Sequence, residues 1–253
     1  MFHKVNISTV SFNSDASSRL VSLYEDALKS TIQAECARVK SCTFAPSSMR
    51  CKRKSWFRLR GVKPDIIQEP DLTMDHTATV GTALHERIQS ILSEALGEDW
   101  ISVEDYLKEF PIPYKYTLTK HGYETKVSID DPPINFSCDG IIRIRGCYYL
   151  LEIKSSEYES WKSLTETKPH HMEQIKTYAT ILDIPRVLTL YIDRQYGRVK
   201  SFEFSVSGEE MTAIKQDMVY VQQMVKANLA PEKLPTGDYV CSNCEYKLKC
   251  KEW

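Results

Sequence analysis

The sequence lacks a long hydrophobic run, a secretory leader pattern and a surplus of basic charge. No apolar stretch approaches the ~18 residues that cross a membrane, and the N-terminal segment MFHKVNISTVSFNSDASS lacks the basic-then-apolar pattern of a secretory signal. Lys plus Arg number 33 against 34 Asp plus Glu, so the formal net charge is -1. This balance excludes a uniformly basic nucleic-acid-binding protein but allows a local basic patch. We expect a cytoplasmic protein that does not enter a membrane.

Internal repeats and low-complexity tracts are also absent, and the composition is that of a globular protein. Of the 253 residues, 42% are hydrophobic and 26% are charged, which allows a sizeable core and argues against disorder. This length fits one or two domains of ~150 residues. Cysteine, by contrast, is abundant. Eight cysteines without a secretory pattern indicate metal or redox use rather than disulfides.

The hydrophobic pattern changes along the chain from helical spacing to alternation and back. Helices are expected at 16–40, from Pro46 to Trp56, from Asp75 or Thr77 to Leu96, at 168–182 and at 208–228, with a short helix or loop at 98–108. Strands are expected at 113–119, 121–129, 135–145, 147–154, 186–193 and 200–207, with turns at His121-Gly122, Arg145-Gly146 and Gly197. Strands in the middle of the chain with helices on either side predict an α/β or α+β domain.

The sharpest local signal is a pair of carboxylates in the hairpin expected around Arg145-Gly146. If these two residues form the turn, Asp139 and Glu152 become direct cross-strand neighbours with Cβ atoms ~5 Å apart. Lys154 shares the face of Glu152, because side chains alternate along a strand. Two like charges this close repel unless a cation lies between them, and a divalent, oxygen-ligated metal is the natural one.

A solvent-facing strand end with an ordinary Glu–Lys pair is the alternative interpretation of this hairpin. Against it, the apolar residues Tyr149, Leu150, Leu151 and Ile153 predict a strand that is buried on both faces. A carboxylate and an ammonium group placed there need partners or a function.

Asp139 followed by Glu152-Ile153-Lys154 resembles the signature of the PD-(D/E)XK nuclease superfamily, and two flanking motifs narrow the resemblance. Gly81-Thr-Ala-Leu-His85 is similar to the helical G-x-x-x-H motif of the RecB-like branch, and Gln174-Ile-Lys-Thr-Tyr178 is similar to its Q-x-x-x-Y helix. All four elements occur in the order of the family. The resemblance implies an α/β fold with a restriction-endonuclease-like core, in which helices flank a central mixed β-sheet.

Each of these side chains has a chemical role under this interpretation. His85 offers a neutral imidazole, and Asp139 and Glu152 offer oxygens, a donor set that suits Mn²⁺ as well as Mg²⁺. Lys154 would orient or help to deprotonate the attacking water and offset charge in the transition state.

The resemblance itself adds further roles. It makes the backbone carbonyl of Ile153 a further metal ligand, and it assigns Gln174 and Tyr178 to the DNA strand and to positioning Lys154. Glu124 either lines the metal site or faces solvent. His171 has no assigned role.

Three cysteines gather in the C-terminal tail with the spacing Cys241-x2-Cys244-x5-Cys250. Such a set suggests a metal with a fourth thiolate from upstream, for which Cys36, Cys42 and Cys51 are the candidates. The segment around Cys51 resembles the one that carries the first cluster cysteine in iron–sulfur exonucleases of the RecB-like branch, which include CRISPR-associated RecB-type exonucleases, the AddB nuclease domain and phage relatives. The resemblance implies a [4Fe–4S] cluster that joins the N- and C-terminal segments.

Zinc is the alternative for this cysteine set, since four thiolates bind either metal, and free thiols are a third interpretation. Cys138 and Cys147 alternate with strand residues and are expected to be small hydrophobic side chains of the core.

A basic segment lies between residues 50 and 63 and contains no acidic residue. Its cations could follow a phosphate backbone while Trp56 or Phe57 offers a stacking face. The cations are Arg50, Lys52, Arg53, Lys54, Arg58, Arg60 and Lys63. The alternative is a solvated helix face with both aromatic side chains in the core.

We therefore expect a single nuclease domain over 1–253, with an N-terminal helical segment at 1–75, a catalytic core at 76–207 and a C-terminal helix and tail at 208–253. The expected activity is metal-dependent hydrolysis of DNA. Exonuclease action on single-stranded ends is expected by family analogy alone, in phage or cellular recombination, repair or CRISPR adaptation. The expected setting is accordingly a bacterial, archaeal or phage-infected cell. The alternative function is a non-catalytic DNA-binding module held together by its cysteine site. Oligomeric state and strand polarity have no signature.

Overall fold

The computed structural model describes residues 15–36, 41–65, 71–242 and 244–252. The chain forms two compact units, one made of Met1–Val39 and Ile67–Thr77, the other of Lys40–Ile66 and Ala78–Trp253. In the first unit, α1 (Asp15–Cys36) confirms most of the helix expected at 16–40, whose last residues lie outside the described ranges. Among the described residues, no helix is both long and apolar enough to span a bilayer. The assignment of a single domain stays a prediction.

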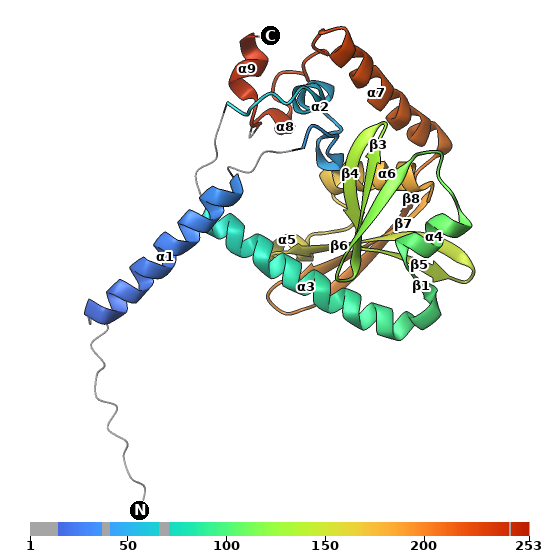
Figure 1. The fold of residues 1–253 in the computed structure, drawn as a ribbon. Coiled ribbons are helices and arrows are strands. Elements are labelled where there is room, and N and C mark those ends of the chain that lie inside the picture. Colours follow the sequence, from blue (N-terminus) through green and yellow to red (C-terminus); the bar gives the residue numbers. More distant parts are fainter. Residues whose placement is uncertain (1–14, 37–40, 66–70, 243, 253) are drawn as a thin grey trace, which may run out of the picture. The chain divides into compact units, whose positions relative to one another are not determined.

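A five-stranded mixed sheet forms the centre of the second unit (Figure 1). Its strand order is β1 (Trp100–Ile101), β5 (Gly140–Ile144), β6 (Cys147–Ser156), β7 (Arg186–Asp193) and β8 (Val199–Ser205). Only β6 and β7 run parallel, and α5 (Tyr158–Lys162) and α6 (Pro169–Leu182) form the crossover between them. The predicted α/β fold with a central mixed sheet is confirmed.

A second, antiparallel sheet contains β2 (Tyr116–His121), β3 (Glu124–Asp130) and β4 (Pro133–Cys138). Val127 and Ile129 alternate with exposed or half-buried neighbours, as the sequence pattern predicts. The expected strand at 135–145 is wrong in one respect, because it breaks at Asp139 into β4 and β5, which belong to different sheets. This break places Asp139 at the junction of the two sheets.

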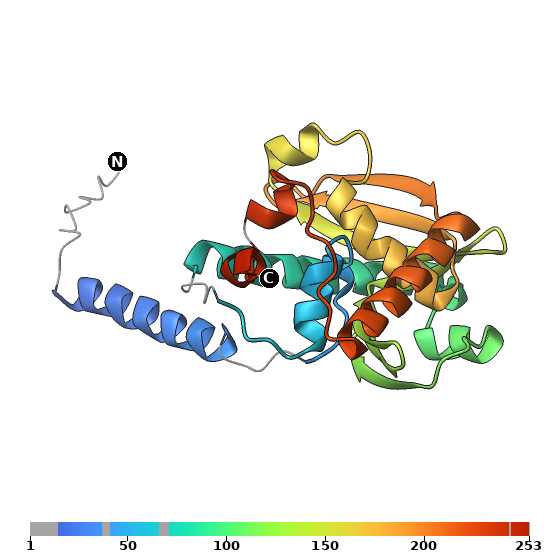
Figure 2. The ribbon, with the colours of Figure 1, turned by 90° about the horizontal axis from the view of Figure 1, so that it is seen from above.

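Helices cover both faces of the central sheet (Figures 1 and 2). On one face, Ile88 of α3 (Leu72–Leu96) packs with Leu151 and Ile153 of β6. On the other face, Leu150 of β6 packs in the main core with Ile175 of α6, and α7 (Gly208–Lys226) joins the same core. The buried strand β6 therefore contacts a helix layer on each side, as its apolar run predicts.

Short helices complete the second unit, and two predicted helix starts need correction. The short elements are η1 (Pro46–Ser48), α2 (Lys52–Leu59), η2 (Gly97–Asp99), α4 (Val103–Glu109), α8 (Tyr239–Ser242) and α9 (Lys247–Glu252). The helix expected from Pro46 is a 3₁₀ turn, after which Cys51 is the N-cap of α2. The N-terminus of α3 is capped by Asp71 rather than by Asp75 or Thr77, since the Asp71 side chain accepts the backbone N–H groups of Thr73 and Met74.

The glycine after Asp139 is required by close packing. A Cβ on Gly140 would lie 2.8 Å from the Trp100 ring. We expect Gly140→Ala to lower the free energy of unfolding by about 1–3 kcal/mol, because the ring must move. Gly208, the first residue of α7, is the control because a Cβ there meets no atom within 4 Å. Gly208→Ala should be neutral or stabilising by about 0.5 kcal/mol. Urea unfolding of both variants measures the difference, and equal midpoints would contradict the packing argument.

Candidate active site

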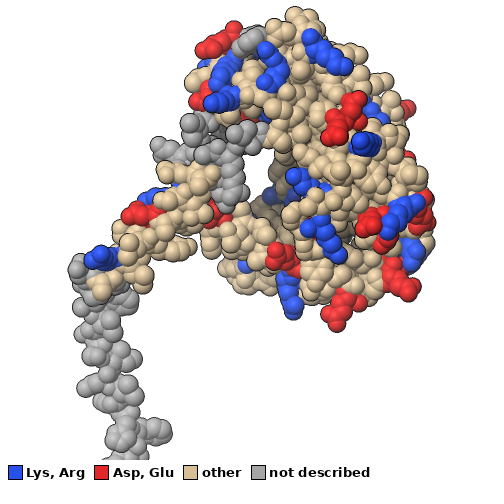
Figure 3. Space-filling model, viewed as in Figure 1, with Lys and Arg blue, Asp and Glu red and all other residues tan. Residues whose placement is uncertain are grey.

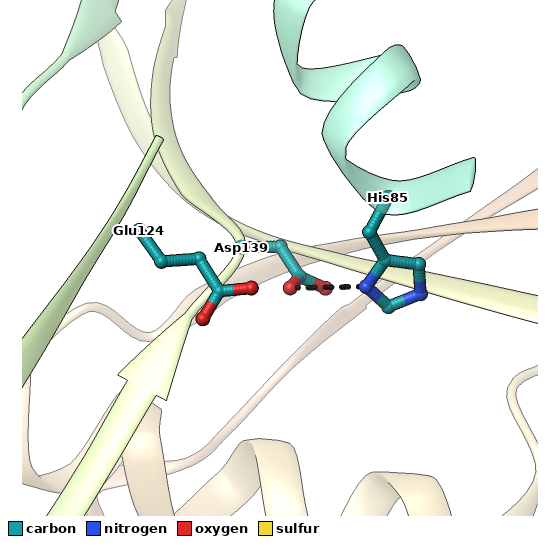
Figure 4. Close-up of side chains that lie close together, drawn as sticks. All are labelled: His85, Glu124 and Asp139. Carbon is teal, nitrogen blue, oxygen red and sulfur yellow. Dashed lines mark ion pairs between the residues drawn. The ribbon is translucent and has the colours of Figure 1, made fainter. Parts of the chain in front are cut away.

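Three potential metal ligands converge from three elements of the second unit. His85 lies on α3, Glu124 is the first residue of β3, and Asp139 lies between β4 and β5. One ligand atom from each residue lies within 4.8 Å of the other two. Figure 4 shows the three side chains pointing toward one another, with His85 Nδ1 3.4 Å from Asp139 Oδ1. One imidazole and two carboxylates make a donor set that fits Mn²⁺ or Mg²⁺.

Asp139 is held in place from two sides. Its Oδ2 accepts the backbone N–H of Ile153 at 2.6 Å, and its backbone carbonyl accepts Gln89 Nε2 at 2.8 Å. The ladder between β5 and β6 has the predicted register but ends at the Gly140–Leu151 pair, one residue before the predicted Asp139–Glu152 pair. Both residues of the predicted Arg145-Gly146 turn have positive φ angles, 51° and 75°, as a two-residue hairpin turn of type I′ requires. The turn thereby sets the register that brings Asp139 beside β6.

A chain of polar contacts leads from β6 to α6. Lys154 Nζ donates to Glu152 Oε1 at 2.5 Å and to Gln174 Oε1 at 3.4 Å. Gln174 Nε2 in turn donates to the Tyr178 hydroxyl at 2.5 Å. The four side chains of the predicted E-x-K and Q-x-x-x-Y motifs are thus joined in one network. Glu152 lies outside the group of three ligands, and its buried Oε2 has no hydrogen-bond partner.

Burial and the nearby Asp139 charge make two carboxylates, Glu152 and Glu124, hard to ionise. Burial, and next the Asp139 carboxylate, raise the pKa of Glu152, while Lys154 opposes the shift. Burial, and next the Asp139 carboxylate, also raise the pKa of Glu124. A divalent cation at this place would relieve both causes. The partnerless Glu152 oxygen and the convergent donors therefore fit a metal site.

His171, for which the sequence indicated no role, is a half-buried side chain of α6 that contacts β7. Its Nδ1 lies 2.7 Å from the Tyr191 hydroxyl, which also accepts the backbone N–H of Lys168. Burial, and next the charge of Lys154, lower the pKa of His171 to about 3. An imidazole in this state adds no positive charge beside Lys154.

The basic segment at 50–63 contains two residues whose predicted contact with DNA is wrong. Trp56 is fully buried and donates its Nε1 hydrogen to Met224 O, so it has no face for a base. Arg53 is also buried, and its Nε donates to Pro231 O at 2.6 Å. Phe57 is equally buried and stacks on Tyr246. For Trp56 and Phe57 the alternative of core packing is the right one.

Five other cations of this segment contact acidic or aromatic partners. Arg50 pairs with Glu173 and Asp238, Lys52 with Asp217, and Lys54 and Arg58 lie 4.0 and 3.9 Å from Glu245, while Arg60 lies over the Trp56 ring. On the face drawn in Figure 3, Lys and Arg stand beside Asp and Glu rather than forming one basic surface. DNA contact by these residues stays a prediction.

The four predicted cluster cysteines line one cavity of about 200 Å³. Cys51 comes from the N-cap of α2, and Cys241, Cys244 and Cys250 come from the tail. In the part of the chain that the structure describes, only the His85 group has three ligand atoms within 4.8 Å of one another, so no three of these sulfur atoms are that close.

The other described cysteines are apart from this cavity. Cys138 is buried and Cys147 is half-buried in strands, as expected, and Cys42 is exposed. The side chain of Cys36 lies outside the described residues.

The sequence analysis did not identify Gln89 as a residue of the site, and it did not decide the role of Glu124. Gln89 holds the Asp139 carbonyl, and its position four residues after His85 on one helical face was the signal that could have found it. Glu124 is a member of the ligand group. Its place at the start of a strand gave no means to choose between the metal site and solvent. Gly81, the first residue of the G-x-x-x-H motif, lies close to β6, because a Cβ there would be 3.3 Å from Ser155 Oγ.

No family model matches the sequence, and no curated protein matches it. Among solved structures, the chain is similar to the crystal structure of SSO0001, at 16% identity and a TM-score of 0.43, over 85% of this chain and 98% of that one. It is also similar to an alkaline exonuclease (LHK-Exo) from Laribacter hongkongensis, at 15% identity and a TM-score of 0.45, over 76% and 91% of the two chains. To the complex of LHK-Exo with dAMP, the chain has 14% identity and a TM-score of 0.47, again over 76% of this chain and 91% of that one. Likenesses this low assign no family.

Removal of the Gln89 amide should loosen the Asp139 junction. Gln89→Leu keeps the volume but leaves the buried Asp139 carbonyl without its donor, so the free energy of unfolding should fall by about 1–3 kcal/mol. The control is Gln222→Leu, which removes a surface bond to Asp131 and should cost less than about 0.5 kcal/mol. Chemical denaturation measures both. Equal small losses would mean that Gln89 does not hold the junction.

Proposed function

We propose that this protein is a metal-dependent DNA nuclease that hydrolyses phosphodiester bonds with Mn²⁺ or Mg²⁺. The observation that carries the proposal is the convergence of His85, Glu124 and Asp139 beside a buried Glu152–Lys154 pair. Burying several ionisable groups together lowers the stability of the fold, and such clusters occur mainly at functional sites.

The metal would be held by His85, Asp139 and Glu124, with Glu152 and the backbone carbonyl of Ile153 as further ligands. His85 and the two carboxylates already face one another, and the free Oε2 of Glu152 offers an oxygen without breaking its bond to Lys154. When bound, the ion supplies a water of lowered pKa and neutralises charge on the scissile phosphate.

Lys154 is the residue that we assign to the attacking water. Its ammonium group is fixed by Glu152 and Gln174, so it is oriented before a substrate arrives. In that position it can hold the water and offset the negative charge that develops in the transition state. Gln174 positions Lys154 and would contact the DNA strand, whereas Tyr178 is buried against Phe136 and acts by holding Gln174.

The finer assignments extend the family resemblance. We propose an exonuclease that acts on single-stranded DNA ends, in phage or cellular recombination, repair or CRISPR adaptation, within the cytoplasm. The order of the four motifs from Gly81 to Tyr178 supports these assignments by analogy.

We also propose a [4Fe–4S] cluster bound by Cys51, Cys241, Cys244 and Cys250, with zinc as the alternative. Support comes from the cavity that these four residues share. The cluster would be structural, since its ligands join α2 to the tail.

The activity is tested by Mn²⁺-dependent digestion of end-labelled single-stranded DNA. Lys154→Ala and Glu152→Gln should each lower the rate by about 100-fold or more, because they remove the oriented ammonium group or an anionic ligand. The matched control is the exposed pair of α4, changed as Lys108→Ala and Glu104→Gln, which should digest DNA like the wild type. Mutants of the buried pair that digest DNA at the wild-type rate would show that the assigned site is wrong. Wild-type protein that binds but never cleaves would favour the non-catalytic module.

The cluster is tested by the colour of anaerobically purified protein. We expect a broad visible absorbance band that Cys244→Ser abolishes, because a [4Fe–4S] cluster needs all four thiolates. Cys42→Ser is the control, since Cys42 is exposed and lies outside the cavity, and it should keep the band. Colourless protein with stoichiometric zinc would replace the cluster with the zinc alternative.

A further inference from the structure

Aromatic and basic side chains meet at one end of the central sheet, where α5 lies against the turn between β7 and β8. We propose that Tyr196 and Arg198, backed by Tyr158, form a binding surface for single-stranded nucleic acid, with a base stacked on Tyr196 and a phosphate on Arg198. We call these three residues the tyrosine–arginine surface. The inference rests on the proposed function, because it names where the substrate strand passes beside the same site.

The three side chains form a compact, exposed group. The Tyr158 and Tyr196 rings meet edge to face with centroids 5.0 Å apart. The Arg198 guanidinium lies 5.4 and 5.1 Å from the two ring centroids and donates to the Tyr158 hydroxyl at 3.3 Å. Tyr196 is nevertheless 58% exposed. A large aromatic side chain held at the surface has an open face on which an unpaired base can stack.

Buried contacts hold this turn in one conformation. Asp193 is fully buried, and its carboxylate accepts the backbone N–H groups of Gln195, Tyr196 and Arg198 at 2.8, 2.9 and 3.1 Å. These bonds hold the pKa of Asp193 below its usual range against the opposing effect of burial. The tyrosine–arginine surface is therefore ordered before binding, which lowers the entropic cost of association.

The α5 side is held as firmly. Trp161 donates its Nε1 hydrogen to Tyr191 O, and Lys200 Nζ donates to the carbonyl groups of Lys162, the last residue of α5, and of Leu164. In Figure 2, α5 is the yellow helix at the top of the view. Tyr158, the first residue of α5, is thus fixed relative to the turn that carries Arg198.

The tyrosine–arginine surface lies close to the proposed catalytic lysine. The parallel strands β6 and β7 pair Lys154 with Tyr191 and Ser156 with Asp193. The turn therefore begins only two residues, or about 7 Å, beyond Lys154 along the strands. The carboxyl ends of parallel strands are where α/β sheets bind ligands. A strand whose phosphate sits at Lys154 would reach this turn with its next nucleotides.

Charge also favours this surface over the basic segment at 50–63. No carboxylate of the described residues lies within 4.0 Å of the Arg198 guanidinium, whereas Arg50 and Lys52 of the basic segment form close ion pairs. A cation that already pairs with a carboxylate must give up that contact before it binds a phosphate. Arg198 has no such contact to lose. An aromatic face beside a cation matches single-stranded nucleic acid, because bases in a duplex keep their faces stacked on one another.

The test measures binding without metal, so that cleavage does not enter. Full-length protein is titrated into a fluorescein-labelled oligothymidylate in buffer with a chelator, and Kd is read by anisotropy at several salt concentrations. Tyr196→Ala and Arg198→Ala should each raise Kd about tenfold, while Tyr196→Phe should stay within about twofold of the wild type. Arg198→Ala should also reduce the slope of log Kd against log salt by about 0.7, as loss of one phosphate contact to a single strand requires.

Two matched controls lie elsewhere on the chain. Arg186 stacks on Tyr149 at the opposite end of β7, and Tyr24 is an exposed tyrosine of α1. Arg186→Ala and Tyr24→Ala should leave Kd and the salt slope unchanged. Thermal melting of every variant shows that each is folded. Wild-type binding by Tyr196→Ala and Arg198→Ala, or equal losses in the two controls, would overturn the inference.

The outcomes separate this inference from the proposed activity. Protein that cleaves DNA while Tyr196→Ala and Arg198→Ala bind normally keeps the nuclease and loses the tyrosine–arginine surface. Protein that never cleaves, but loses binding in these two variants, keeps the surface and loses the nuclease. Wild-type protein that does not bind the oligothymidylate would also overturn the surface.

Discussion

The placement of one carboxylate, Asp139, is the constraint on which the rest of the site depends. Asp139 lies where β4 leaves one sheet and β5 enters another, held by the Ile153 N–H and the Gln89 amide. The hydrogen bond from the Ile153 N–H ties Asp139 to β6, the strand that carries Glu152 and Lys154. A shift of the hairpin by one residue would turn every side chain of β6 to the opposite face. The register of this hairpin therefore decides whether an active site exists.

The buried charges explain why the arrangement suits a cation. Glu152 and Lys154 neutralise each other, but Asp139 and Glu124 add negative charge beside them, and burial raises the pKa of both Glu152 and Glu124. Removing charges from water is costly, and an ion pair returns that cost only when its remaining atoms are satisfied. The second oxygen of Glu152 is not satisfied within the protein. A divalent ion bound to His85 and the carboxylates would satisfy it.

The sequence was most informative about structure that depends on residues close together in the chain. Arg145-Gly146 predicted the turn, and the turn predicted the register of β5 and β6, although the ladder ends one residue before the predicted Asp139–Glu152 pair. The sequence was least informative about contacts between segments that are far apart in the chain. Arg53 and Trp56 belong to a segment rich in positive charge, yet their partners lie more than 160 residues away and bury them. Glu124 shows the same limit, because its neighbours come from a helix and a strand junction that no local pattern places beside it.

The proposed site holds one divalent ion between α3 and the junction of the two sheets. Crystals soaked in Mn²⁺ and measured at the manganese absorption edge would locate this ion. We expect one anomalous peak within bonding distance of His85 and Asp139, on the side of Lys154. A fully occupied manganese ion elsewhere, or no anomalous peak beside His85 and Asp139 at saturating Mn²⁺, would contradict this site.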